Sequence, residues 1–353
     1  MNDPLHLHDQ HPVENTHHHE HGDDEHDHKH AGKATGRHAH SHVSAPVLTD
    51  PAQATSAGIR AVKISLVVLA LTALFQVGVA INSGSVALLA DTIHNFSDAL
   101  TAIPLWLAFA VSRRGRNARY THGYGRAEDL AGAVIVTLIF VSALEVFNQS
   151  IQKVIHPAPI ANLGWVAAAA LTGFLGNELA AILRLRAGRA IHSAALVADG
   201  RHSQVDGFTS LGVLVGVIGV RLGFPLADPL VGFAIGITIL VVAWKSGREI
   251  WYRLMDAADP EETRLVEQTA LAAPGVLGVQ DIRLRWLGHW QEAELHIMVE
   301  GKLLTLESHQ IAETVRHALF HALERLQEIN VHVDPYEQRP GPAHELTAHH
   351  EKH

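Results

Sequence analysis

The sequence predicts a polytopic α-helical membrane protein with six transmembrane helices and a small α+β domain behind them. Charged residues make up 18% of the chain, below the roughly 25% that is usual in soluble proteins. Six apolar stretches are each long enough to cross a hydrocarbon core of about 30 Å. After residue 256 the pattern changes to short alternating segments, which are typical of a soluble domain. These observations argue against a soluble globular enzyme.

Basic residues in the connections between the apolar stretches predict an orientation. The connection after the second stretch carries five arginines, and the one after the fourth carries Arg184, Arg186 and Arg189. The opposite connections carry only Lys153 and Arg221. By the positive-inside rule, we expect both termini in the cytoplasm. The six predicted spans are residues 64–82, 85–111, 128–148, 161–183, 193–220 and 225–244.

Composition divides the chain into four parts. Residues 1–57 form a His-rich, acidic arm with little apolar surface to bury, so we expect a disordered arm that captures metal weakly at many sites. Residues 58–250 form the transmembrane transport domain, 257–336 the small domain and 337–353 a His-rich tail. The net charge of −9 gives no nucleic-acid footprint, and the absence of cysteine excludes disulfides and thiolate ligands.

Periodicity within the small domain predicts the element order α-β-β-α-β. Residues 261–272 and 306–325 have the spacing of helices. Apolar and polar residues alternate at 281–286 and 292–299, and again around 329–333. This order indicates a compact α+β sandwich.

Two of the predicted spans carry the same polar pattern, A-D-x-x-H-x-x-x-D. Residues at i, i+3 and i+7 of a helix lie along one face, so each span presents a stripe of carboxylate, imidazole and carboxylate. Ionised groups in a membrane normally face a partner or an aqueous cavity. The pattern occurs as Asp91, His94 and Asp98 in the second span, and as Asp199, His202 and Asp206 in the fifth.

The two stripes predict a site for a divalent metal ion. His94 and Asp98, with His202 and Asp206, supply two imidazoles and two carboxylates, a set suited to tetrahedral Zn²⁺ with Co²⁺ and other divalent ions as alternatives. Asp91 and Asp199 could orient the imidazoles or accept protons. The competing interpretation is that each polar residue only makes a hydrogen bond between helices. Two copies of the pattern in matching contexts favour the metal site.

In these motifs the chain resembles the cation diffusion facilitator family of metal-ion transporters. The resemblance covers roughly residues 57–336 and rests on four segments: residues 85–91, the two H-x-x-x-D pairs, residues 123–128, and residues 274–276 leading into 281–283. It implies a homodimer with six transmembrane helices and a cytoplasmic ferredoxin-like domain. It also implies export of Zn²⁺ or a related divalent ion, mostly in exchange for protons, with His94, Asp98, His202 and Asp206 as the transport site.

The resemblance assigns further residues outside the predicted spans. Arg126 and Asp256 match an interlock pair near the dimer interface. Gln280 stands where many relatives have another histidine, and the connection that holds Tyr120, His122 and Tyr124 lacks the acidic and histidine ligands of some relatives, so no strong metal site is expected there. The positions that match the family's cytoplasmic metal ligands are His296, His309, His332 and Asp334.

Metal binding of this kind predicts proton coupling, because imidazoles bind metal only when neutral and carboxylates only when ionised. We therefore expect an exporter in the bacterial inner membrane that is not an enzyme and has no prosthetic group. We expect metal to be the substrate, with a role as regulatory ligand as a further option. The alternatives are a Co²⁺, Ni²⁺ or Cd²⁺ specialist, which the His-rich arm favours, and a membrane metal sensor. An intramembrane metal enzyme is disfavoured because four ligands leave no open position for water.

Overall fold

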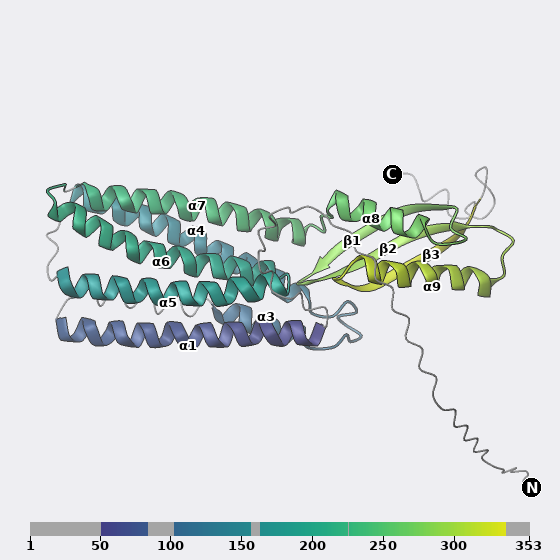
Figure 1. The fold of residues 1–353 in the computed structure, drawn as a ribbon, viewed down its shortest axis with the longest axis horizontal. Helices are drawn as coiled ribbons and strands as arrows, with labels where there is room; N and C mark the ends of the chain where they lie inside the picture. The colour runs from purple at the N-terminus through teal and green to yellow at the C-terminus, as the bar shows by residue number, and fades with distance from the viewer. Residues whose placement is uncertain (1–50, 84–101, 157–162, 225, 337–353) are drawn as a thin grey trace, which may run out of the picture. The chain divides into compact units, whose positions relative to one another are not determined.

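The structure is a computed structural model that describes residues 51–83, 102–156, 163–224 and 226–336. These residues belong to one compact unit, Ala45–His353. Six of its helices run side by side as a bundle (Figure 1). Helix α5 packs against α6 and α1, and α4 packs against α7. The six helices are α1 (Pro51–Ser83), α3 (Ala102–Ser112), α4 (Arg126–Ile155), α5 (Leu163–Ala190), α6 (Ala194–Arg221) and α7 (Ala227–Leu254).

Four of the described helices are long and apolar enough to cross a membrane, namely segments of α1, α4, α5 and α7. Their outward faces expose large apolar side chains such as Leu74, Phe75 and Trp244, as lipid-facing helices do. Helix α6 is equally long, but the polar stripe from Asp199 to Asp206 lowers its hydropathy. The predicted span 85–111 lies largely outside the described residues, and α3 is its final part. The predicted fold class is confirmed.

The helices extend further than their apolar segments, so several predicted connections are wrong. Helix α5 continues to Ala190, and Arg184 and Arg186 therefore lie within it rather than in a loop. Helix α7 likewise continues to Leu254 and contains Lys245, Arg248 and Arg253. Lysine and arginine are good helix formers, whereas an apolar window detects only the part of a helix that crosses hydrocarbon.

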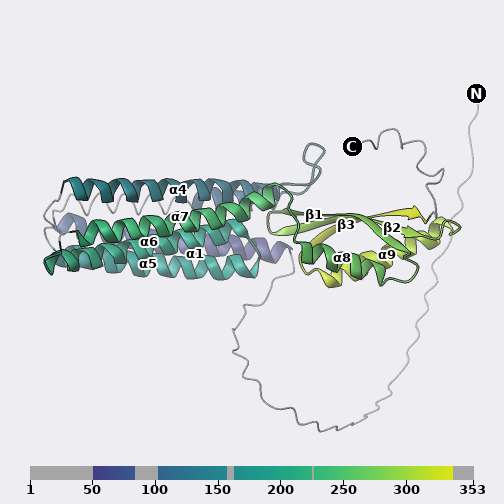
Figure 2. The same cartoon turned by 90° about the horizontal axis from the view of Figure 1, so that it is seen from above.

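The C-terminal domain has the predicted order of elements. Strands β1 and β2 pair antiparallel, and β3 joins β2 in parallel after the α9 crossover. Both helices lie on one face of this sheet (Figure 2), where Leu295 and Ile297 of β2 meet Leu319 of α9 in a fully buried core. The elements are α8 (Pro260–Leu271), β1 (Gly278–Leu287), β2 (Trp290–Val299), α9 (Thr305–Ala322) and β3 (Leu326–Pro335).

The turn between β1 and β2 joins the C-terminal domain to the helices. Gly288 has a φ of 65°, donates its backbone N–H to Asp129 Oδ2 at 3.0 Å, and accepts from Arg253 Nη1 at 2.6 Å. The next residue, His289, places Nδ1 2.6 Å from Glu128 Oε2, and both side chains are almost fully buried. The turn is thus held by polar contacts to Glu128 and Asp129 at the start of α4 and to Arg253 at the end of α7. Because these groups are buried, water screens the contacts little.

Replacing Gly288 by alanine is expected to loosen this turn. A left-handed backbone costs a residue with a Cβ about 1–2 kcal/mol, and here the Cβ would also lie 2.8 Å from both Gly125 O and Glu128 Oε2. We expect Gly288→Ala to lower the thermal unfolding midpoint of the detergent-solubilised chain. Gly301→Ala is the matched control, because the Cβ there meets its nearest neighbour at 3.4 Å without a positive φ. Equal midpoints for the two variants would contradict the assignment.

Candidate metal sites

Helix α6 presents the predicted stripe on one face. His202 and Asp206 lie one turn apart, and Nδ1 of the imidazole is 3.5 Å from Oδ1 of the carboxylate. Their side chains are 2% and 13% exposed, so the pair faces the interior of the bundle rather than the lipid. An imidazole nitrogen and a carboxylate oxygen from one helix can reach the same metal ion with little rearrangement. The other predicted residues, Asp91, His94 and Asp98, lie outside the described residues.

Asp199 forms a buried ion pair that the sequence analysis did not foresee. Its Oδ2 is 3.1 Å from Nη1 of Arg184 on α5, and both side chains are within 1% of complete burial. The same guanidinium donates to Ser65 Oγ of α1 at 2.8 Å and to Ser203 Oγ of α6 at 2.7 Å. Arg184 therefore ties three helices together beside His202. Asp199 was expected to orient imidazoles or accept protons; the interaction that the structure gives it is with Arg184.

A second candidate metal site lies on the sheet of the C-terminal domain. His296 and His332 are directly opposite each other on β2 and β3. The Asp334 carboxylate lies between the two rings, 3.0 Å from His296 Nδ1 and 3.0 Å from His332 Nε2. One ligand atom from each residue falls within 4.8 Å of the others. Two imidazoles and a carboxylate at this spacing are a donor set for Zn²⁺ or a similar ion that leaves a coordination position open.

Two other residues with predicted roles near this site are not members of the cluster. His309 is exposed at the start of α9 and is not a member of the group that the described residues form. Gln280 pairs with His296 across β1 and β2, so it does occupy the neighbouring position. Its amide donates to Met298 Sδ at 3.0 Å instead of adding an imidazole. Within the described part of one chain, the structure therefore brings together three of the four predicted ligands.

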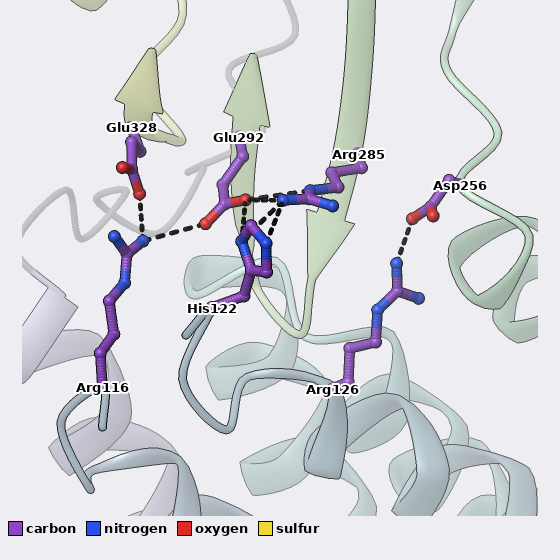
Figure 3. A network of polar contacts seen from close by, with 7 residues as sticks. All are labelled: Arg116, His122, Arg126, Asp256, Arg285, Glu292 and Glu328. Atoms are coloured by element: carbon purple, nitrogen blue, oxygen red, sulfur yellow. Dashed lines mark hydrogen bonds and ion pairs between the residues drawn. The ribbon is translucent and has the colours of Figure 1, made fainter. Parts of the chain in front are cut away.

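The connection between α3 and α4 binds the C-terminal sheet through ion pairs (Figure 3). Arg116 pairs with Glu328 of β3 and lies 3.1 Å from Glu292 Oε1 of β2. The hydrogen bond between Arg116 and Glu328 raises the pKa of Arg116 and lowers the pKa of Glu328. Glu292 also pairs with Arg285 at 2.7 Å, and His122 Nδ1 lies 3.4 Å from the same carboxylate. His122 thus contacts the sheet.

The Arg126–Asp256 pair is present as a contact between the first residue of α4 and the second residue after the end of α7 (Figure 3). Arg126 Nη1 also donates to the Leu254 carbonyl at 3.4 Å. Asp256 has a φ of 54°, a left-handed conformation that few residues adopt. The pair therefore fixes the chain at the point where it leaves the bundle for the C-terminal domain.

Sequence reasoning missed the groups that hold this junction together. Glu128 and Asp129 are almost fully buried although they are charged, and Glu128 belongs to the segment 123–128 on which the family resemblance rests. Two adjacent acidic residues at the start of an apolar helix were a usable signal, because buried charges are retained only with partners. Their partner, the β1–β2 turn, could not be identified because it lies about 160 residues away in the sequence.

Comparison with known proteins agrees with this organisation. Residues 62–255 match the cation efflux transmembrane domain, and residues 258–336 match the cytoplasmic domain of cation efflux proteins. A probable cation efflux system protein of Mycobacterium tuberculosis is 49% identical over 298 residues, which cover 84% of this chain and 90% of that protein. The cation-efflux pump FieF of Yersinia pestis is 28% identical over 264 residues, 74% of this chain and 88% of that protein.

More distant similarities were also found. The magnetosome protein MamB of Paramagnetospirillum magneticum is 28% identical over 267 residues, covering 74% of this chain and 89% of that protein. Among solved structures, a MamM CTD variant in its nickel form is 25% identical and covers 22% of this chain and 100% of that chain, with a TM-score of 0.22.

Fold and comparisons together define an integral membrane protein of the metal-cation transporter class, built from a helical bundle and an α+β domain. The chain belongs to the cation diffusion facilitator family, whose members carry cations out rather than catalyse a reaction.

Removing Arg184 is expected to destabilise the bundle through the charge that it leaves behind. Arg184→Gln isolates a buried Asp199 carboxylate, and breaking a buried pair in this way costs about 3–5 kcal/mol. The double variant R184Q/D199N removes both charges and should recover most of the loss in unfolding free energy, measured by denaturant unfolding in detergent. Arg186→Gln, on the exposed side of the same helix, is the control. If D199N restored nothing in the R184Q background, the ion pair would not be the cause.

Proposed function

We propose that the protein exports divalent transition-metal ions, foremost Zn²⁺, from the bacterial cytoplasm across the cell membrane in exchange for protons. The observation that carries this proposal is the buried His202–Asp206 pair on α6, in a chain whose second span repeats the same H-x-x-x-D pattern at His94 and Asp98. Each helix would contribute one imidazole and one carboxylate to the transported ion. Such nitrogen and oxygen donors favour Zn²⁺ over Mg²⁺ and Ca²⁺.

Proton exchange follows from the chemistry of these ligands. An imidazole must lose its proton before it can bind metal, so metal loading releases protons. Histidine titrates near neutral pH, and a proton arriving from the outer side can therefore compete with the ion for His202. Loading on one side and protonation on the other give antiport without any further energy source.

Orientation and assembly are part of the same proposal. The C-terminal domain matches the cytoplasmic domain of cation efflux proteins. Basic residues gather at the C-terminal ends of α5 and α7, and the end of α7 contacts that domain through Arg253. Both observations support cytoplasmic termini. We propose a homodimer, in which a residue of the partner could complete the three-ligand set of His296, His332 and Asp334. Metal held there would act as a regulatory ligand.

The second candidate is a Co²⁺, Ni²⁺ or Cd²⁺ exporter with the same mechanism. The His-rich arm at residues 1–57 favours it, because soft and borderline ions bind imidazole well. A membrane metal sensor is the remaining alternative, and it would bind metal without moving it. To identify the transported metal, the chain can be expressed in cells that lack their own exporters, and growth can be measured in the presence of each metal in turn. Only the metals that the chain exports should become less toxic.

Transport should depend on His202 and on the proton gradient. In proteoliposomes, Zn²⁺ flux through the native chain should rise when an imposed pH gradient drives protons the opposite way, with proton movement read by an internal pH dye. We expect His202→Ala to lower the flux at least as much as the roughly 10–100-fold that changes around metal ligands cost. His317→Ala, an exposed histidine on α9, should leave it unchanged. A Zn²⁺ flux that is the same with and without the pH gradient would indicate a channel. Binding of Zn²⁺ without any flux would indicate a sensor.

Asp334 should control metal binding in the C-terminal domain independently of transport. Its carboxylate contacts both imidazoles at 3.0 Å, so Asp334→Asn removes one ligand and the negative charge. We expect Zn²⁺ affinity at one class of sites to fall by roughly 10–100-fold in a chelator competition assay on the full chain. Glu313→Gln, an exposed carboxylate on α9, is the control with the same change of charge. An unchanged affinity in the Asp334 variant would remove this residue from the site.

A further inference from the structure

A cavity of about 420 Å³ lies where the end of α5, the start of α6, the end of α7 and the start of β3 meet. Its described lining carries four guanidinium groups and a single carboxylate, that of Glu249. Like charges that converge on one cavity create a strong positive potential there. The four arginines are Arg189, Arg201, Arg253 and Arg325.

The nearby carboxylates do not neutralise these arginines. Glu249 lies 3.9 Å from Arg201 and 4.0 Å from Arg253, beyond hydrogen-bonding distance, and its side chain is 43% exposed. Arg325 is 3.8 Å from Glu262, which does not line the cavity. Exposed pairs at such distances contribute little. The cavity therefore retains a net positive charge.

Arg253 is the most buried of the four and is held by neutral groups. It donates from Nη1 to Gly288 O at 2.6 Å and from Nη2 to His192 O at 3.0 Å. These carbonyls fix the guanidinium but do not cancel its charge. Its side chain is 11% exposed. The carboxylates of Glu128, Asp129 and Glu249 attract it, but among the described residues none of them hydrogen-bonds to it, so an anion in the cavity would stabilise it further.

The positive potential of the cavity also acts on His192, which lies in the short connection between α5 and α6. Burial, together with the charges of Arg325 and Arg253, lowers its pKa to about 4, so the ring is neutral at physiological pH. The ring atom Nε2 is buried and has no hydrogen-bond partner in the part of the chain that the structure describes. Ser193 caps the start of α6 by accepting from the Leu196 N–H at 3.1 Å. The N-terminus of a long helix adds further positive character.

We propose that this arginine cavity is a binding site for a phosphate group, and that an anionic phospholipid headgroup supplies it. Guanidinium groups match the geometry of phosphate oxygens and hold them with paired hydrogen bonds. The cavity lies at the ends of α5 and α7, two of the membrane-spanning helices. On the last turns of α7, Trp251 and Tyr252 are exposed, as aromatic residues are at a membrane–water interface. Basic pockets between helices at this level suit acidic headgroups.

Binding can be measured on the full chain in detergent, without reference to transport. We would titrate dioleoyl-phosphatidylglycerol, dioleoyl-phosphatidylcholine and inorganic phosphate separately and follow the thermal unfolding midpoint. Phosphatidylglycerol should raise the midpoint saturably, whereas the zwitterionic lipid should not. The variant R189Q/R325Q should need roughly tenfold more phosphatidylglycerol, because two charged donors are lost. The control R186Q/R316Q removes two exposed arginines that do not line the cavity.

Each outcome has a defined meaning. If inorganic phosphate raises the midpoint by itself and competes with the lipid, the phosphate site stands and a soluble phosphate can fill it. If phosphate has no effect and only the anionic lipid saturates, the headgroup is the source. The proposal is overturned if both lipids act equally on the native chain, or if R189Q/R325Q and R186Q/R316Q titrate alike. The comparison between the two lipids uses only the native chain. It therefore still tests the proposal if R189Q/R325Q folds poorly.

Discussion

A charge that is buried in an apolar helical bundle needs a partner, and this constraint organises the protein. Removing an ion from water costs several kcal/mol in a protein interior, yet the bundle buries the side chains of Arg184 and Asp199 almost completely. They are tolerated because each neutralises the other and because Ser65 and Ser203 accept from the guanidinium. The arrangement fixes α6 beside α5. It also keeps the next turn of α6, with His202, oriented toward the interior of the bundle, where the imidazole lies beside the Asp206 carboxylate.

The same constraint explains how the C-terminal domain is attached. A covalent connection alone would leave the domain free to move, but the β1–β2 turn inserts between charged residues that are themselves buried. Without His289, the Oε2 atom of Glu128 would lose its hydrogen-bond partner, and Gly288 leaves the space that both side chains need. From this turn β2 runs toward His296, and β3 lies parallel to it with His332 opposite His296. Ion pairs from Glu292 and Glu328 on the same two strands hold the α3–α4 connection. The candidate metal cluster and the contacts to the helices therefore lie on the same sheet.

Sequence patterns predicted the elements of this fold better than its contacts. Apolar length and period-2 alternation depend on local chemistry, so the helical bundle and the order α-β-β-α-β could be found from single segments. His296, His332 and Asp334 were named through the family resemblance, and the register of β2 and β3, which the structure supplies, brings them together. The partners of Arg184, Glu128 and Arg253 could not be found in this way, because each lies on another element and depends on tertiary packing. Helix ends were also misplaced, since α5 and α7 continue past the hydrocarbon into polar sequence.

Arginines counted together as an orientation signal have distinct physical roles. The positive-inside rule needs only their number near the helix ends, and it treats Arg184 and Arg189 as equivalent. Five residues apart on α5, one is 1% exposed and paired with Asp199, whereas the other lines an open cavity. The difference follows from helical geometry: a displacement of five residues turns the side chain by about 140°, from the interior toward the cavity. A charge count can therefore orient a membrane protein, whereas only the position on the helix face decides which charge stabilises the bundle and which can attract a ligand.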